Sequence, residues 1–361
     1  MINVLAIFGG RSAEHDISVI TAIEALNAMP FNGYRTYPAY MRDGVWYGGD
    51  KLYDLKNYTD FEPQKHKKIA LIGKKLYEER RGKLKFITEV DCALLLTHGG
   101  EGEGGALQGF LEVSGIPYTS ANAMECALTI NKHLTKLALK NIGVHVVDGV
   151  VLKDFSVNSI ENVEKLIGYS AFVKPNSQGS SIGVGRATCR DELIEKIKVA
   201  LEYDSVILVE KYLENYLELN CAVSMMEDKI VASEVEKPMG AKEFLSFDNK
   251  YVDGVKGGMQ GCGREFPAKI DDELRKKVRE TSLKVYKELN LDGIVRFDYM
   301  YSNELYLNEI NAIPGSLAHY LYPDLTYTEF LKILIANGIK KGLPKRKSFV
   351  SNVLKVGKGK C

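Results

Sequence analysis

The sequence predicts a multidomain protein in which an α/β domain with an open parallel sheet comes first and α+β domains follow. Three observations indicate this fold class. The chain has 361 residues, which suits two or three domains of roughly 150 residues each. In the first third, apolar runs alternate with helical patterns, and each run ends in a glycine-rich turn. Later in the chain, short strands follow one another and long helices flank them.

The N-terminal α/β domain is expected over residues 1–123. Its two clearest strands are 4–8 and 92–96, short apolar runs of the kind found in buried parallel sheets. A helical pattern follows each strand, starting near Ile17 after the first turn and near Leu107 after the second. Strand, glycine turn and helix in this order form the repeating unit of an open parallel sheet.

A central domain is expected over residues 124–213 and a C-terminal domain over residues 214–345. The central domain should begin with one helix from residue 124 to 140, because a cationic residue and then a glycine follow that pattern. A second long helix is expected over residues 271–289. The strands expected in these two domains are 146–152, 171–173, 206–209, 219–225 and 230–235.

Two segments depart from these regular patterns. Residues 240–265 are polar and punctuated by glycine, and a loop of that length in a compact domain predicts either a lid over a site, the interpretation taken here, or a disordered segment. Residues 346–361 are basic and poor in apolar side chains, which predicts a flexible tail.

Charge and composition exclude several classes of function. Forty-eight basic and 47 acidic residues leave a net charge of +1, so neither nucleic acid nor an anionic membrane is expected as a partner. There is no apolar run of about 18 residues and no basic start typical of a signal peptide. The six cysteines form no CxxC pair, which favours reduced thiols in a cytoplasmic protein over a zinc site.

Residues 172–184 form a candidate phosphate-binding loop. A strand delivers Lys174, and Ser180 and Ser181 follow between two glycines. Backbone N–H groups and hydroxyls of such a loop can donate to phosphate oxygens while the lysine supplies charge. The segment lacks the order of a Walker loop. An ordinary hairpin turn is the alternative interpretation.

A predicted hairpin over residues 293–311 carries candidate metal ligands. The two-residue period of a strand places Arg296 and Asp298 on one face, and Glu309 and Asn311 together on the next strand. Two carboxylates and an amide oxygen suit Mg²⁺ that also holds phosphates. The alternative is a hairpin face exposed to solvent, although polar groups on otherwise apolar strands favour a buried site with a partner.

Two glycine turns of the N-terminal domain carry further candidates. Residues 8–16 and 97–109 both follow strands and open helices, where backbone N–H groups favour anions. Glu14 and His98, at the ends of neighbouring strands, could bracket a zwitterion. Read alone, a histidine at a strand end is more often structural.

Taken together and in this order, these segments resemble the D-alanine–D-alanine ligases of the ATP-grasp superfamily. The resemblance runs from Phe8 to about Pro323. Its most specific pieces are Phe8-Gly9-Gly10-Arg11-Ser12-Ala13-Glu14-His15, His98-Gly99 with Gln108-Gly109, Lys174-Pro175 with Gly179-Ser180-Ser181-Ile182-Gly183, Lys250-Tyr251, Arg296-Phe297-Asp298, and Asn308-Glu309-Ile310-Asn311 with Pro314-Gly315. Each piece is common, and the ordered set is specific.

The resemblance implies an ATP-grasp fold that holds ATP between the central and C-terminal domains, with two Mg²⁺ ions for which Mn²⁺ is an alternative. The implied ATP-binding residues are Lys132, Lys174, Ser180, Ser181, Glu210, Lys211, Leu213, Glu218, Lys250 and Asn308. The implied metal ligands are Asp298, Glu309 and Asn311. The implied substrate-binding residues are Glu14, His98, Arg296, Gly315, Tyr320 and Leu321, and those implied in catalysis are Glu14, Ser180, Tyr251, Arg296 and Gly315.

The implied reaction joins D-alanine to a second D-amino acid, most simply D-alanine, for peptidoglycan synthesis. The donor carboxylate attacks the γ-phosphate of ATP, and the second amine then attacks the acylphosphate. A homodimer is also implied. Tyr320 stands where the family has a serine for the acceptor, which leaves D-serine or another amino acid open. The rivals are another ATP-grasp carboxylate–amine ligase and a nucleotide-binding relative without activity.

Overall fold

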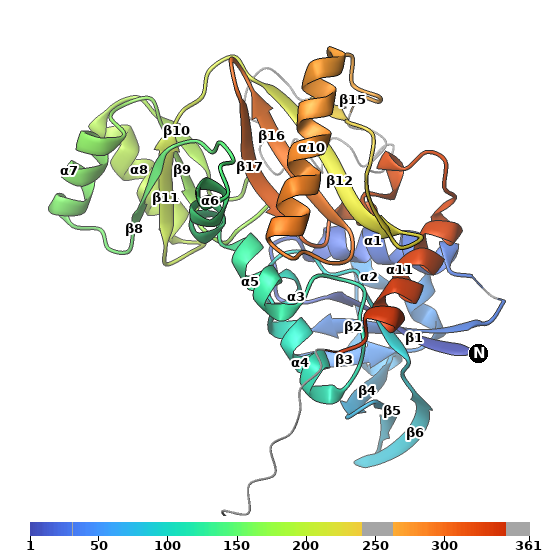
Figure 1. Cartoon of the computed structure of the whole chain (residues 1–361). Coiled ribbons are helices and arrows are strands. Elements are labelled where there is room, and N and C mark those ends of the chain that lie inside the picture. The colour runs from blue at the N-terminus through green and yellow to red at the C-terminus, as the bar shows by residue number, and fades with distance from the viewer. Residues whose placement is uncertain (31, 240–262, 344–361) are drawn as a thin grey trace, which may run out of the picture.

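The computed structural model describes residues 1–30, 32–239 and 263–343, and Figure 1 shows its three main sheets as separate bodies. The N-terminal sheet has seven strands in the order β6-β5-β4-β3-β2-β1-β7. Its strands are β1 (Ile2–Gly9), β2 (Tyr34–Arg42), β3 (Val45–Gly48), β4 (Lys67–Ile72), β5 (Lys75–Arg80), β6 (Lys83–Glu89) and β7 (Cys92–Leu95). The expected strands 4–8 and 92–96 are therefore confirmed as β1 and β7.

The expectation of an open parallel sheet is correct for only part of this sheet. β1 pairs in parallel with β2 and with β7, whereas β2 through β6 form an antiparallel meander. The turns at 43–44, 73–74 and 81–82 have two residues each, and so short a connection can join only antiparallel neighbours. The N-terminal sheet is mixed.

Helices cover the parallel part of the N-terminal sheet. They are α1 (His15–Ala28), α2 (Lys56–Thr59), α3 (Gly100–Glu103) and α4 (Ala106–Ser114), with single 3₁₀ turns η1 (Asp50–Tyr53) and η2 (Pro63–Lys65). The last helix, α11 (Tyr327–Lys341), returns to this sheet (Figure 1) and buries Phe330 and Ile335 in the same core as Phe8. The end of the chain therefore completes the first core.

The central sheet is antiparallel, in the order β10-β9-β11-β8. Its strands are β8 (Gly149–Leu152), β9 (Ala171–Pro175), β10 (Gly185–Ala187) and β11 (Ile207–Lys211), and its helices are α7 (Val157–Leu166) and α8 (Arg190–Leu201). The single helix expected over residues 124–140 is wrong. Two helices, α5 (Ala123–Ile130) and α6 (Lys132–Asn141), meet at Asn131, which has an extended backbone and accepts a 3.0 Å bond from the N–H of Leu134.

The third sheet is also antiparallel, in the order β13-β12-β16-β17. Its strands are β12 (Leu217–Met226), β13 (Lys229–Ala232), β16 (Val295–Tyr301) and β17 (Leu305–Asn311). Helix α10 (Asp272–Glu288) packs on it, and β14 (Lys237–Pro238) with β15 (Arg264–Glu265) forms a short ribbon beside it. The irregular turn η5 (Gly315–Leu321) follows β17. The expected lid loop, apart from residues 263–265, and the expected tail lie outside the described residues.

Two smaller observations bear on the sequence-based expectations. In the described ranges, no helix combines the length and the apolar character that crossing a bilayer requires. Cys92, Cys126, Cys189 and Cys221, the cysteines within those ranges, all have free thiols.

Candidate active site

Lys174 connects the central sheet to the third sheet. It lies on β9 with its side chain buried, and its Nζ contacts the carboxylate of Glu210 and lies 3.3 Å from Asn308 Oδ1 on β17. Lys136 of α6 approaches the same carboxylate, with Nζ 2.5 Å from Glu210 Oε1. Burial raises the pKa of Glu210, but Lys174 and Lys136 outweigh it and hold that pKa below its ordinary value. Glu210 is therefore a buried anion between two lysines.

The candidate phosphate loop is more than a hairpin turn. It spans residues 176–184 between β9 and β10, and Ser180 and Ser181 both have a positive φ. Lys132 holds the loop at its base, because its Nζ donates a 2.6 Å bond to the carbonyl oxygen of Gln178. At its tip, the Ser180 hydroxyl donates to the carboxylate of Glu14 in the N-terminal domain. The loop thus bridges two parts of the protein.

The candidate metal ligands lie together on β16 and β17, as the two-residue period predicts. Asp298 is opposite Glu309 and Arg296 is opposite Asn311 in the strand register. Arg296 donates to both Asp298 oxygens at 2.7 and 2.8 Å, and Asn311 Nδ2 donates to Oδ2 at 3.0 Å. The side chains of Asp298 and Glu309 are only 16% and 29% exposed, which excludes a fully solvated hairpin face.

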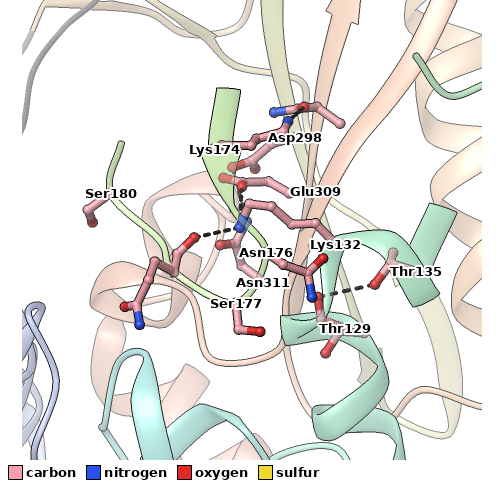
Figure 2. A network of polar contacts seen from close by, with 12 residues as sticks. Thr129, Lys132, Thr135, Lys174, Asn176, Ser177, Ser180, Asp298, Glu309 and Asn311 are labelled. Atoms are coloured by element: carbon pink, nitrogen blue, oxygen red, sulfur yellow. Dashed lines mark hydrogen bonds and ion pairs between the residues drawn. The ribbon is translucent and has the colours of Figure 1, made fainter. Parts of the chain in front are cut away.

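Figure 2 shows these groups in one place, where Lys132, Lys174, Asp298, Glu309 and Asn311 gather and Ser180 lies to one side. Lys132 Nζ lies 3.6 Å from Glu309 Oε2, so the lysine that holds the phosphate loop is also paired with a candidate metal ligand. Two carboxylates and one amide form a donor set of hard oxygens that suits Mg²⁺, with phosphate oxygens to complete its shell. The residues therefore fit the metal that the sequence predicts.

Glu14 is enclosed where the phosphate loop meets the N-terminal domain. It precedes α1, and the backbones of two glycines press against it: a Cβ on Gly179 would lie 2.6 Å from Oε2, and one on Gly99 would lie 2.7 Å from it. Burial raises the pKa of Glu14, as does Glu309, while the Ser180 hydrogen bond opposes the shift. A carboxylate held in this way suits a cationic ligand such as an ammonium group.

His98 has both ring nitrogens engaged in the structure. Its Nδ1 lies 2.8 Å from the carbonyl oxygen of Ile313, and its Nε2 lies 2.9 Å from the hydroxyl of Thr21. Burial lowers the pKa of His98 to about 4, so the ring is neutral at physiological pH. Through its contact with Ile313, His98 holds the backbone of the loop before Gly315. Contact with a substrate carboxylate stays a prediction.

Glu103 is a functional candidate that the sequence-based prediction missed. Its carboxylate accepts a 3.0 Å bond from the N–H of Gly99 and a 3.2 Å bond from the N–H of Ile313. Burial raises its pKa to about 7, and the nearby Glu14 adds to that shift. The available signal was an acidic residue inside a glycine turn that opens a helix, a place where carboxylates accept backbone N–H groups.

The segment after β17 carries the remaining predicted substrate residues. Gly315 opens η5, and Tyr320 is partly buried with its hydroxyl beside Arg296. Leu321 is fully buried, and its side chain belongs to the core of the N-terminal sheet.

The remaining predicted ATP contacts lie where the central and third sheets join. Lys211 ends β11, Leu213 lies in the connection to β12, and Glu218 is exposed near the start of β12. Lys250 and Tyr251 are outside the described residues.

Known proteins resemble the chain over almost its whole length. Residues 3–121 match the family model described as "D-ala D-ala ligase N-terminus", and residues 138–334 match "D-ala D-ala ligase C-terminus". The chain belongs to the D-alanine–D-alanine ligase family. A D-alanine–D-alanine ligase of Thermosipho melanesiensis is 35% identical over 100% of both chains. The sequence-based prediction of the family, and with it of an ATP-dependent ligase, is confirmed.

Solved structures show the same fold in members of this family. The VanG D-Ala:D-Ser ligase of Enterococcus faecalis matches with a TM-score of 0.78 and 27% identity over 93% of this chain and 99% of that chain. A D-alanine–D-alanine ligase of Bacillus anthracis complexed with ATP matches with a TM-score of 0.67 and 23% identity over 94% and 98% of the two chains. The predicted multidomain ATP-grasp fold is therefore confirmed, with the mixed N-terminal sheet as its correction.

Proposed function

We propose that this enzyme uses ATP to join D-alanine to a second D-amino acid, with D-alanine as the favoured acceptor, and so supplies a dipeptide for peptidoglycan precursors. Two contacts that meet in one place carry the proposal. The phosphate-loop hydroxyl of Ser180 donates to Glu14 of the N-terminal domain, and Lys132 pairs with Glu309 of the third sheet. A donor amino acid, a phosphate chain and a metal would therefore share one enclosed space.

The nucleotide would lie between the central and third sheets. Lys132, Lys174 and the loop serines supply positive charge and donors for its phosphates, which a phosphoryl transfer requires. Asn308 would lie beside the same phosphates, because its Oδ1 accepts a 3.3 Å bond from Lys174 Nζ. The adenosine would be contacted by Glu210, Lys211, Leu213 and Glu218. Lys250 would add a further cation to the phosphates.

Asp298, Glu309 and Asn311 would hold the magnesium ions. When bound, magnesium neutralises charge on the phosphoryl group that is transferred. Arg296 pairs with Asp298 along two hydrogen bonds and so orients that carboxylate before any ion arrives. Mn²⁺ has the same preference for oxygen ligands and is the alternative ion.

The donor would be held by its ammonium group at Glu14. Its carboxylate oxygen attacks the γ-phosphorus of ATP, ADP leaves, and an acylphosphate forms. The second amino acid's amine then adds to the acyl carbon, loses a proton and expels phosphate. Arg296 and the backbone N–H of Gly315 are the donors that would stabilise the tetrahedral oxyanion. Enclosure protects the acylphosphate from water, and Tyr251 would contribute from the predicted lid.

D-serine is the second candidate acceptor. Two observations favour keeping it: the VanG D-Ala:D-Ser ligase is 27% identical over most of the chain, and Tyr320 replaces the serine that the family pattern places at the acceptor. The tyrosine changes the shape and the hydrogen-bonding groups at that position. Acceptor choice therefore has to be measured.

A direct experiment incubates the protein with Mg·ATP, D-alanine and a panel of second amino acids. The expected product is D-alanyl-D-alanine, detected by mass spectrometry together with one ADP and one phosphate per dipeptide. Release of phosphate with no dipeptide, for every pairing of amino acids, contradicts the proposal.

The homodimer that the resemblance implies is tested by sedimentation velocity on the same preparation.

A further inference from the structure

Two arginines converge on Tyr320 from different parts of the third domain. Arg296 of β16 lies within hydrogen-bonding reach of the Tyr320 hydroxyl. Arg264 of β15 lies over the face of the same ring, with its guanidinium carbon 4.5 Å from the ring centroid. A cation over an aromatic face is attracted by the electron-rich ring, so the stacking fixes where Arg264 points.

The two guanidinium groups differ in what balances their charge. Arg296 gives two hydrogen bonds, at 2.7 and 2.8 Å, to the carboxylate of Asp298, which neutralises it. Arg264 is exposed and forms no ion pair with any acid in the described ranges. Glu236 interacts with it electrostatically, but Glu236 is buried and accepts a hydrogen bond from Asn220. Among the residues that the structure describes, Arg264 is therefore an oriented cation with no paired acid.

The position of this cation matters because the second substrate must reach the same place. In the proposed reaction, its amine would approach the acyl carbon beside Arg296 and Gly315, and its carboxylate would lie on the side away from the phosphates. The planar guanidinium of an arginine can donate two parallel N–H bonds to a carboxylate, and an arginine held by stacking does so with little loss of side-chain freedom. Tyr320 contacts both arginines, Arg296 through its hydroxyl and Arg264 through its ring.

We propose that Arg264, stacked on Tyr320, binds the carboxylate of the second amino acid. This inference rests on the proposed ligase function and adds the group that recognises the acceptor. The site selects α-amino carboxylates over amines that lack the acid, and the tyrosine ring bounds the space left for the acceptor's side chain. A purely structural role for Arg264, covering the ring, would give no such selection.

The test is a competition in one tube. The enzyme receives Mg·ATP, D-alanine as the only donor, and an equal concentration of D-alaninamide, which can act only as an acceptor. Mass spectrometry gives the ratio of dipeptide to dipeptide amide, and that ratio depends on the acceptor step alone. We expect the wild type to favour the acid strongly and Arg264→Gln to lower the ratio by roughly tenfold or more, since a charge-assisted hydrogen-bonded pair is lost. Arg264→Lys should restore part of the wild-type preference for the acid.

A matched control comes from the N-terminal sheet. Arg35 is also exposed and also stacks on a tyrosine, Tyr37, at 5.6 Å, but it lies at the start of β2, away from the site. Arg35→Gln should leave the product ratio unchanged. If the wild type forms dipeptide and Arg264→Gln keeps the wild-type ratio, the inference about Arg264 is overturned and the proposed ligase function stands. If the wild type forms no dipeptide, the proposed function is overturned and the inference with it.

Discussion

Glu103 accepts a 3.2 Å hydrogen bond from the backbone N–H of Ile313, a residue 210 positions later in the chain. The carbonyl oxygen of Ile313 is held in turn by His98 Nδ1 at 2.8 Å. Three residues further on, the N–H of Ser316 donates a 3.2 Å bond to the hydroxyl of Thr21. The N-terminal domain thus fixes the backbone on both sides of Gly315, whose N–H is a candidate oxyanion donor.

The first prediction concerns Glu103 and pH. Its pKa is raised to about 7, so ionisation of Glu103 penalises the folded state, and stability from this group falls as pH rises from about 4.5 to about 7. Glu103→Gln cannot ionise. Relative to the wild type, the variant should gain up to ~3 kcal/mol of unfolding free energy between pH 5 and pH 8. Thermal melts at both pH values measure this difference.

Glu101→Gln is the matched control for that experiment. Glu101 lies on the same glycine turn but is partly exposed and faces Arg11. Its substitution should not reproduce the change with pH. A difference between wild type and Glu103→Gln that stays constant from pH 5 to pH 8 would contradict the assignment.

The second prediction concerns Thr21. Its hydroxyl donates to His98 Nε2 and accepts from the N–H of Ser316. A neutral His98 that donates from Nδ1 must accept at Nε2, so one tautomer satisfies the whole chain of bonds. Thr21→Val keeps the shape and removes the hydroxyl that pairs with the buried His98 Nε2 and with the partly buried N–H of Ser316, which costs ~1–3 kcal/mol of stability. We expect kcat to fall because Gly315 loses its position, while the KM for ATP stays near the wild-type value.

Thr328→Val provides the comparison. The Thr328 hydroxyl also donates one partly buried bond, 2.8 Å long, to the carbonyl oxygen of Ala28, but it contacts none of the site groups. It should lower the melting temperature without lowering kcat. Equal effects of the two substitutions on kcat would show that loss of stability alone explains Thr21.

The third prediction concerns Glu210 between Lys136 and Lys174. Glu210→Gln leaves two buried lysines without an acid and should cost ~3–5 kcal/mol, whereas the double variant Lys136→Met with Glu210→Gln should recover part of this loss. The double-mutant cycle is read from unfolding free energies. The exposed pair Lys340–Asp228 is the control, and Asp228→Asn should cost less than ~1 kcal/mol. No coupling in the cycle would refute the buried triad.

Much of the site could be predicted from the sequence because strand geometry is local. The two-residue period of residues 295–301 and 305–311 suffices to bring Asp298 and Glu309 together, and the register confirms it. The mixed N-terminal sheet could not be predicted in this way. β6 is mostly exposed and rich in charge, so it has no apolar run to mark it as a strand. Glu103 was missed because its partner, Ile313, lies in a different domain.

The fourth prediction concerns the nucleotide site. Lys174→Ala should raise the KM for ATP and lower kcat, because a buried phosphate-facing cation is lost and Glu210 keeps only Lys136. Glu309→Gln should fold normally and lose turnover, because one oxygen ligand carries less charge. Lys165→Ala on the exposed face of α7 is the control. Wild-type rates for both site variants would place the nucleotide elsewhere.

The last prediction concerns Glu14 as the ligand of the donor's ammonium group. Burial raises its pKa, and only the ionised form attracts an ammonium, so donor affinity should fall as pH falls through that raised pKa. Glu14→Gln should raise the donor KM by roughly tenfold or more and flatten its pH dependence. Gly179→Ala tests the same carboxylate in a second way, because the added Cβ would lie 2.6 Å from Glu14 Oε2 and displace it. Both variants should weaken donor binding while ATP binding, measured without D-alanine, persists. A donor KM that neither substitution changes would mean that the ammonium group binds elsewhere.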